Sequence, residues 1–256
     1  MLNEILEDQI IIIQLNNGNT NSITMDTLQH IDEIVNKANQ DDHIKGLIFT
    51  GTGKFMSSGF DLPMFLKFKD HAEVIEWFIK EEAILMNYFG CQKPVIAAIN
   101  GHAAAAGLIF SMASDYRIVK NHPKIKIGMS ENKIGLPLSI AQAEVVRFGL
   151  NSDHLYRDVM FFGDMVNVDK AKMMGIVDEI VEEDQLIQRA KQIIVSWIDN
   201  PGRPFIPMKR QLKYHTLQKI QLGLQQDQWK EELKRFFDPN VRATLEFVQA
   251  AMDSKA

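Results

Sequence analysis

Residues 95–107 read VIAAINGHAAAAG, and this stretch sets the pattern of the fold. Val95–Ile99 is a short apolar run that leads into a turn signal at Asn100-Gly101, which is typical of a buried strand. The small side chains that begin Ala103–Ala113 then favour a helix packed close to the sheet, because small side chains let two backbones approach. A strand followed by a tight turn and a helix indicates an α/β layer fold.

The alternation of strands and helices extends outward from this stretch in both directions. Further short apolar runs are predicted to be strands at Gln9–Leu15, Gly46–Thr50, Tyr116–Val119, Ile125–Ile127 and Val177–Val181. Apolar residues recur at helical spacing over residues 24–39 and 72–90, and a helix is expected after Pro137. Gly51–Asp61 is rich in glycine and serine, so it is predicted to be a loop.

The C-terminal part of the chain differs from this alternating part. Everything after Glu182 reads as helical, with interruptions at prolines. We therefore predict an α/β core over residues 1–198 and a helical region over residues 199–256. The apolar stripe from Trp229 to Phe237 is expected to serve core or subunit packing rather than ligand binding.

The composition is that of an ordinary globular protein, with 46% hydrophobic and 24% charged residues among 256. A chain of this length buries a core without help from disulfides or metal ions. Its single cysteine, Cys91, cannot form an intramolecular disulfide, which fits a reducing compartment. No apolar run approaches the ~20 residues that span a bilayer. The acidic start at Met1–Asp8 is unlike a basic leader, so we expect a cytoplasmic protein that does not bind membranes.

The net charge of −5 gives no general attraction for nucleic acid, and no Cys/His cluster indicates a metal site. An anionic ligand would therefore need a local basic patch. Lys209 and Lys213 have i, i+4 spacing, so they share one face of a predicted helix and could meet a phosphate group. An ordinary solvated helix face explains them equally well. Lys54 is a second, weaker candidate.

Two segments could place backbone N–H groups where negative charge develops on a substrate. In residues 99–107 these groups lie free at the N-terminus of a predicted helix. The other segment is the loop KFMSSGFDL at residues 54–62. Together they would form an oxyanion hole, in which one donor lowers a barrier by about 3–4 kcal/mol. Either segment alone is a weak indication, because glycine-rich turns before helices are common.

Several segments, taken together, resemble the crotonase, or enoyl-CoA hydratase/isomerase, superfamily in order and spacing. They are NSIT at residues 21–24, SSGFDL at 57–62, PVIAAING at 94–101, DYRI at 115–118, IGMSENKIG at 127–135 and GIVDEIV at 175–181. The resemblance covers most of the chain. It implies a spiral of ββα units that holds an acyl-CoA thioester, with no further cofactor, and a C-terminal helical region that trimerises. The assembly it implies is a homotrimer or a dimer of trimers.

The resemblance also implies roles for individual residues. Members of the superfamily bind the thioester oxygen with two backbone N–H groups, which fall on Phe60 and Ala106 in this sequence. Alanines at residues 104–106 stand where members usually have glycines, and Phe60 replaces a small residue, but both backbone donors remain. The other residues of these two motifs that are expected to border the substrate are Ser58, Gly59 and Gly107.

The carboxylates of the predicted site decide which reaction is favoured. Hydratases of the superfamily carry one glutamate on the helix after the second oxyanion segment and another on the later loop. Here Ile109 fills the first position, and Glu131 matches the second. Adding water is best served by an acid and a base, whereas moving a double bond from C3–C4 to C2–C3 needs one proton shuttle. A lone glutamate in a partly apolar pocket has a raised pKa, which suits that role.

The sequence therefore favours an enzyme similar to the mitochondrial-type Δ3,Δ2-enoyl-CoA isomerases, with Glu131 as the base. Those enzymes also have an apolar residue at the position of Ile109. Another reaction of the superfamily, such as hydration, decarboxylation or thioester hydrolysis, stays open because the same oxyanion hole serves them all. A non-catalytic acyl-CoA-binding subunit is a further alternative, if the alanine run closes the hole.

Other polar residues near these motifs are expected to be structural. His102 follows a turn without a carboxylate partner in view, and Asp61 is expected to orient its loop through hydrogen bonds to the backbone. Asp115 and Arg117 are predicted to pair with each other near a strand.

Overall fold

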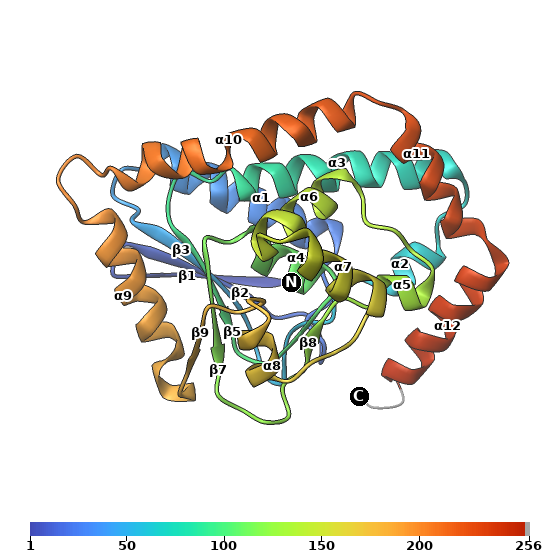
Figure 1. The fold of residues 1–256 in the computed structure, drawn as a ribbon, viewed down its shortest axis with the longest axis horizontal. Coiled ribbons are helices and arrows are strands. Elements are labelled where there is room, and N and C mark those ends of the chain that lie inside the picture. The colour runs from blue at the N-terminus through green and yellow to red at the C-terminus, as the bar shows by residue number, and fades with distance from the viewer. Residues whose placement is uncertain (254–256) are drawn as a thin grey trace.

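The computed structural model describes residues 1–253. Its largest layer is a six-stranded sheet (Figure 1). The strands follow the order β1 (Leu2–Glu7), β2 (Ile10–Leu15), β3 (Gly46–Gly51), β5 (Val95–Ile99), β7 (Tyr116–Lys120) and β9 (Glu179–Val181). β1 pairs antiparallel with β2, and all the other neighbours are parallel. The α/β class predicted from the sequence is confirmed.

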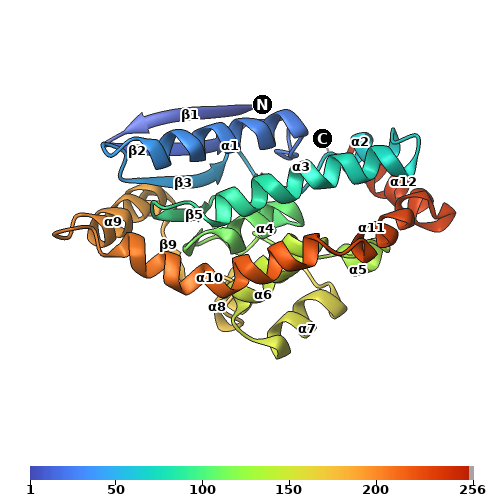
Figure 2. The same ribbon diagram turned by 90° about the horizontal axis from the view of Figure 1, so that it is seen from above.

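Both faces of this sheet are buried, which explains why its strands read as unbroken apolar runs. Successive side chains of a strand point to opposite faces. In the run Ile10–Ile13, alternate residues accordingly join two different clusters. One cluster includes helix α9 (Leu186–Ile198), and the other is the main core, to which helices α1 (Met25–Gln40) and α3 (His71–Phe89) contribute (Figure 2).

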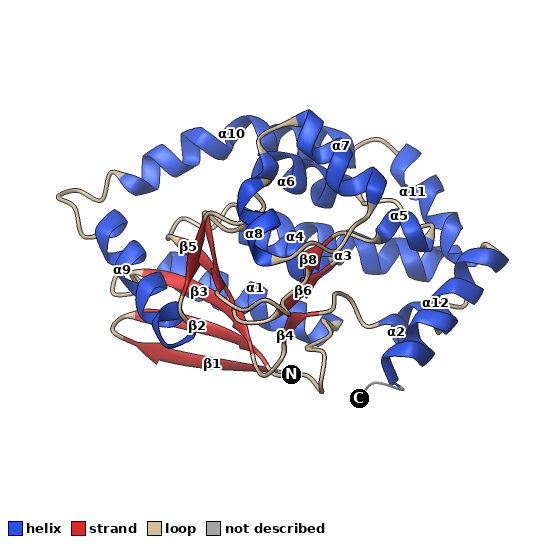
Figure 3. Cartoon of the chain, turned by 60° about the horizontal axis from the view of Figure 1, so that its bottom comes forward, coloured by secondary structure: helices blue, strands red, loops and turns tan. Residues whose placement is uncertain are grey.

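A second, smaller sheet repeats the connectivity of the first. Its parallel strands are β4 (Phe55–Ser57), β6 (His102–Ala104) and β8 (Ile127–Gly128). Each follows a strand of the large sheet, namely β3, β5 or β7 (Figure 3). β4, β6 and β8 then lead into the helices α2 (Leu62–Leu66), α4 (Ala106–Ala113) and α5 (Glu131–Ile134), respectively. This repetition confirms the predicted spiral of ββα units.

The remaining elements of the described chain are mainly helices, several of which pack against the elements above. They are α6 (Ile140–Leu150), α7 (Asp153–Phe162), α8 (Val168–Met173), α10 (Phe205–Leu224), α11 (Gln228–Glu232) and α12 (Pro239–Asp253), with short 3-10 turns η1 (Glu183–Gln185) and η2 (Leu233–Phe237). α10 packs against α6 and α9, and α12 packs against α2 and α5 (Figure 1). Trp229, Leu233 and Phe236 belong to the main core, as predicted, but Phe236 also lines a cavity, which the prediction excluded. Within the described residues, no helix is long and apolar enough to cross a membrane.

The sequence prediction missed several short strands and the helices α7 and α8. The acidic start of the chain forms β1, and the predicted loop at residues 51–61 contains β4. The helix predicted over Ala103–Ala113 begins only at Ala106, because His102–Ala104 pairs with its neighbours as β6. A strand of three residues is too short to show an alternation of apolar and polar residues. It can be recognised only from the strands with which it pairs, and these are distant in sequence. The other predicted strands and helices are confirmed, with ends that shift by a few residues.

Candidate active site

A cavity of about 350 Å³ lies where the three ββα units meet the C-terminal helices. This volume is within the range of small-molecule sites. The β2–α1 loop gives it a polar border that includes Asn17 and Thr20. Phe65, Phe78 and Phe236 give it an aromatic wall. The cavity therefore offers surfaces suited both to polar groups and to hydrocarbon.

Two backbone segments meet at this cavity because β4 and β6 are parallel neighbours. Ser57 is in register with Ala103, so the chain leaves both strands at the same edge. A Cβ atom built on Gly59 would lie 2.6 Å from the Cβ of Ala105 and 3.3 Å from the backbone N of Ala106, so the two segments touch. Gly59 has φ +108, a conformation that L side chains rarely adopt, and glycine is needed here.

The backbone N–H groups of Phe60 and Ala106 are available to a ligand at this junction. Ala106 is the first residue of α4, so its N–H has no partner within the helix. Phe60 lies beside Ile23 in a β-bridge whose hydrogen bonds use the residues on either side of Phe60 instead. Within the described residues neither N–H makes a backbone hydrogen bond, and both residues line the cavity. Both donors are therefore free of backbone partners among these residues, at the border of the cavity.

Ala105 adopts a strained conformation between these donors. Its φ of 49° and ψ of −128° belong to a region that favours glycine, and such a residue costs about 1–3 kcal/mol. Its methyl group points at Gly59, and both Ala105 and Ala106 line the cavity. The alanine run therefore narrows this corner without closing it.

Glu131 lines the same cavity as the first residue of α5. The residue is only 8% exposed, and its Oε2 has no hydrogen-bond partner among the described residues. Burial raises the pKa of its carboxyl from 4.5 to about 7, although the N–H groups of Ser130 and Glu131 itself favour the anion. This carboxyl therefore exchanges a proton readily near neutral pH.

Ile109 occupies the helical turn that follows the second donor. Its N–H donates to the carbonyl of Ala105, and its side chain is 2% exposed and lines the cavity. The position at which the superfamily's hydratases carry a glutamate thus holds hydrocarbon.

The sequence matches the enoyl-CoA hydratase/isomerase family over residues 6–242. The chain belongs to this family. Enoyl-CoA delta isomerase 1 of Mus musculus mitochondria is 24% identical over 212 residues, covering 82% of this chain and 71% of the relative. Crotonyl-CoA hydratase of Syntrophomonas wolfei is 26% identical over 190 residues, covering 73% of this chain and 71% of the relative. Both names occur among relatives at low identity, so membership fixes a crotonase-family acyl-CoA enzyme and leaves the individual reaction open.

Solved structures of the family have the same fold. The crystal structure of human mitochondrial Δ3-Δ2-enoyl-CoA isomerase has a TM-score of 0.89 and 19% sequence identity to this chain. The superposition covers 99% of this chain and 98% of the human one. The crotonase-like fold implied by the sequence is confirmed.

The remaining predicted residues of this family member differ in their distance from the cavity. Ser58 lines it, and the Ser58 N–H donates to the carbonyl of Thr20. Gly107 packs behind the site, because a Cβ atom there would lie 2.7 Å from the Cβ of Ser57. Lys54 accepts a backbone hydrogen bond from His102 and is not among the residues that line the cavity. A CoA contact by Lys54 stays a prediction.

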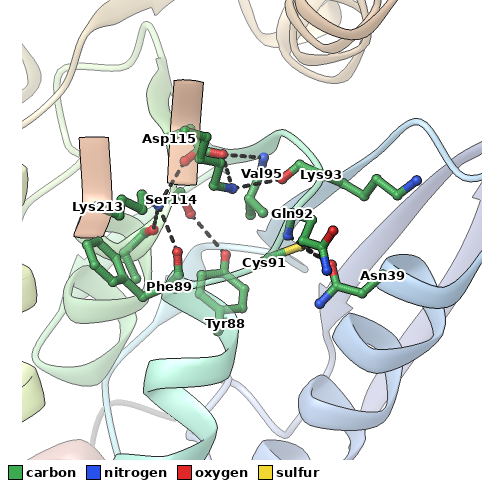
Figure 4. A network of polar contacts seen from close by, with 12 residues as sticks. Asn39, Tyr88, Phe89, Cys91, Gln92, Lys93, Val95, Ser114, Asp115 and Lys213 are labelled. Carbon is green, nitrogen blue, oxygen red and sulfur yellow. Dashed lines mark hydrogen bonds and ion pairs between the residues drawn. The ribbon is translucent and has the colours of Figure 1, made fainter. Parts of the chain in front are cut away.

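Lys209 and Lys213 were predicted to offer a basic patch for CoA phosphates, and this prediction is wrong. They are 6% and 2% exposed, and their Nζ atoms lie 2.5 and 2.8 Å from the two carboxylate oxygens of Asp115. Figure 4 shows Lys213 beside Asp115. Lys213 also donates to the carbonyls of Phe89 and Ala113, which end α3 and α4. Burial lowers the pKa of Lys213 to about 8, so the ammonium persists at pH 7. The two lysines tie α10 to the core.

The predicted pair between Asp115 and Arg117 is also wrong. Asp115 is saturated by the two lysines and by the N–H of Val95. Arg117 instead forms a two-pronged ion pair with Asp178, with 3.0 Å from Nε to Oδ2 and 3.0 Å from Nη2 to Oδ1. Asp115 and Arg117 are two residues apart, a spacing that places side chains on one face of a strand. Their partners nevertheless come from different segments, since α10 supplies the two lysines and the segment before β9 supplies Asp178.

The two residues predicted to be structural have defined partners. His102 accepts a hydrogen bond at Nδ1 from the N–H of Lys126, and its ring packs 4.9 Å from that of Phe55. Asp61 borders the cavity, and its carboxylate accepts from the hydroxyl of Ser22 rather than from the backbone. Among the described residues, no group of three or more His, Cys, Asp or Glu is placed to hold a metal ion.

Sequence reasoning missed most of the cavity wall. Phe65, Phe78 and Phe236 line it from three separate helices, and nothing in their local sequence marks them as substrate contacts. Gln142 also lines it, from the first turn of α6. An Asn-rich loop at residues 16–22 was predicted only as a turn, although its polar composition was a usable signal.

Proposed function

We propose that this protein isomerises 3-enoyl-CoA thioesters to 2-enoyl-CoA thioesters. The observation that carries the proposal is the buried carboxyl of Glu131, which faces the same cavity as the two free N–H groups while Ile109 fills the other catalytic position. One proton shuttle and an oxyanion hole suffice for isomerisation. Hydration is better served by a second carboxyl group.

The proposed reaction moves one proton and one double bond. The thioester oxygen accepts hydrogen bonds from the N–H groups of Phe60 and Ala106. The carboxylate of Glu131 removes a proton from C2, the electrons of that bond delocalise into a dienolate, and the oxygen carries the negative charge. The carboxylic acid of Glu131 then returns the proton to C4, which leaves the double bond between C2 and C3. A pKa of about 7 suits both steps.

The same proposal assigns the rest of the cavity. The polar border at Asn17 and Thr20 faces the pantetheine amides, and the aromatic wall takes the acyl chain. Ser58 and Gly59 hold the first donor in place. The coenzyme A thioester is the substrate, and the proposed chemistry needs no cofactor. The proposed assembly is a homotrimer or a dimer of trimers.

An assay with a 3-enoyl-CoA tests the proposal by following the absorbance of the conjugated 2-enoyl thioester. We expect turnover by the wild type and a fall of about 10²–10⁴-fold in kcat for Glu131→Gln. Glu183→Gln, an exposed glutamate paired with Lys120, is the matched control and should leave kcat unchanged. Equal kcat in Glu131→Gln and the wild type would remove Glu131 from the mechanism.

Hydration is the second candidate, because a crotonyl-CoA hydratase is among the relatives. Incubation with a 2-enoyl-CoA and detection of the 3-hydroxy product separates the two reactions. We expect this product to form much more slowly than the isomerised one, since Ile109 cannot position a water molecule. If hydration were faster than isomerisation, hydration would become the favoured function.

A further inference from the structure

Three cavities share one short segment of the chain as a wall. The segment is the connection between α5 and α6, at residues 135–139. Its residues Leu136, Pro137 and Leu138 line the catalytic cavity of about 350 Å³, and all three also line a second cavity of about 440 Å³. Pro137 and Leu138 line a third cavity of about 240 Å³ as well. A thin part of the protein therefore separates the proposed active site from two neighbouring spaces.

The wall is a single irregular segment at its centre. α5 ends at Gly135, where a φ of +78 turns the chain, and Ser139 precedes the first residue of α6. The Leu136 N–H donates to the carbonyl of Glu131 over 3.1 Å, so the segment begins beside the proposed base. Within the described residues, no backbone–backbone hydrogen bond involves Pro137 or Leu138. Here the side chains of one irregular segment divide the cavities.

The segment borders the aromatic wall of the catalytic cavity. Ala141, in the first turn of α6, donates its N–H to Glu82 of α3 over 2.9 Å. Phe78 of the aromatic wall lies one turn earlier on α3, so the chain passes from Leu138 into α6 next to that wall. An acyl chain that runs from Glu131 along the aromatic wall therefore meets Leu138.

The side chain of Leu138 is the larger of the two that border all three cavities, the other being that of Pro137. Leu138 is partly buried and packs against the main core. The spaces beyond it are also bordered by hydrocarbon, with Met160 and Phe161 of α7 in the second cavity and Leu233 of η2 in the third. Loss of the Leu138 side chain would therefore join the catalytic cavity to further apolar space.

We propose that Leu138 limits the length of the acyl chain by closing the catalytic cavity against its two neighbours. The inference rests on the proposed function, in that the cavity takes an acyl thioester. A volume of about 350 Å³ is near the lower end of small-molecule sites, and this cavity also receives part of the pantetheine arm. The substrate class is therefore thioesters of short acyl chains that end at Leu138. Leu138 is a specificity-determining residue and takes no part in proton transfer.

A substrate series tests this inference. It contains straight-chain 3-enoyl-CoAs of rising length, from the four-carbon chain upward in steps of two carbons. For the wild type we expect kcat/KM to fall by about tenfold or more at the first chain that is too long, because a methylene that does not fit an apolar pocket costs about that much. Leu138→Ala should move this limit to chains about two carbons longer, and Leu138→Phe should move it to shorter chains. Absence of any limit in the wild type, or one limit shared by all three proteins, would overturn the inference.

Leu155→Ala is the matched control for this series. Leu155 is also a partly buried leucine that packs against the main core, but it lies on α7. Among the described residues, the cavity of about 300 Å³ that it lines shares no lining residue with the catalytic one. The same truncation there should leave the chain-length limit at its wild-type value. A shift as large as that of Leu138→Ala would mean that general loosening of the fold sets the limit, and would overturn the role of Leu138.

Binding of saturated thioesters separates this inference from the proposed reaction. Saturated acyl-CoAs cannot isomerise, so their Kd values measured by calorimetry do not depend on catalysis. A Kd that rises about tenfold at a limiting length in the wild type, and at a greater length in Leu138→Ala, supports the inference even if no 3-enoyl-CoA turns over. The same dependence of Kd on length in both proteins, together with normal isomerisation, would overturn the role of Leu138 and leave the proposed reaction standing.

Discussion

Asp115 and Glu131 are both buried carboxyl groups, but they lie in opposite electrostatic surroundings. Burial alone would raise the pKa of Asp115, yet the charges of Lys209 and Lys213 outweigh it and lower the pKa below its usual value. Within the described residues no cation lies against Glu131, so burial raises its pKa to about 7. The neighbouring charge, and not the depth of burial, decides which carboxyl is a fixed anion and which exchanges a proton.

This difference separates a structural site from a chemical one. The anion of Asp115 holds the ammonium groups of Lys209 and Lys213 and so ties α10 to the core, and Lys213 also reaches the ends of α3 and α4 (Figure 4). Glu131 is held only by its position at the start of α5, and it faces a cavity. Removal of a charged partner should therefore cost stability at the first site, and removal of the charge itself should gain stability at the second.

The largest expected effect is at the structural site. Lys213→Met should lower the free energy of unfolding by about 3–5 kcal/mol, because it leaves the buried Asp115 with one cation and frees two carbonyl groups. Lys219→Met is the matched control, since Lys219 pairs with Glu144 at the surface, and it should change stability by less than about 1 kcal/mol. Urea denaturation measures both. Equal losses in the two variants would mean that burial adds nothing to the Asp115 pair.

At the chemical site the expected change has the opposite sign. The pKa of Glu131 rises from 4.5 to about 7 on folding, so the folded state holds this proton more tightly than the unfolded state. The stability gained from that proton is fully present below pH 4.5 and is lost as the pH rises through 7. The rise of about 2.5 units, at about 1.36 kcal/mol each, corresponds to about 3 kcal/mol.

Glu131→Gln removes this dependence because an amide does not ionise. We expect the variant to be more stable than the wild type by up to about 3 kcal/mol at pH 8, and the gain to shrink as the pH falls toward 5. Denaturation curves at both pH values measure it. A gain of the same size at both values would show that packing, rather than ionisation, is responsible.

The sequence allowed prediction of the elements whose signal is local. The run Ile10–Ile13 indicates a strand covered on both faces, and residues 95–107 indicate a strand, a turn and the start of a helix. These local elements depend on neighbours in sequence, which a single sequence records. Glu131 and the two backbone donors, by contrast, were predicted from the resemblance to the family, whose motifs occur in the order of the ββα units.

The features that were missed depend on what covers a residue. The i, i+4 spacing of Lys209 and Lys213 shows that they share a face of α10, but the core that receives this face comes from α3, α4 and the segment between α4 and β7. Nothing in the local sequence of Glu81 and Glu82 indicates burial, yet both are buried and the start of α6 covers Glu82. In both cases the covering segment is far away in sequence.

The smallest expected effect concerns the corner between the two donors, where Ala105 holds a positive φ of 49°. Ala105→Gly should raise the free energy of unfolding by about 1 kcal/mol, because relief of backbone strain exceeds the entropy that glycine adds to the unfolded chain. Ala104→Gly is the matched control, since Ala104 lies in β6 without a positive φ, and should lower it by about 0.5–1 kcal/mol. Loss of stability in both variants would show that Ala105 is not strained. A gain confined to Ala105→Gly, with kcat retained, would mean that the donors keep their places without the methyl group, so that β4 and β6 alone position them.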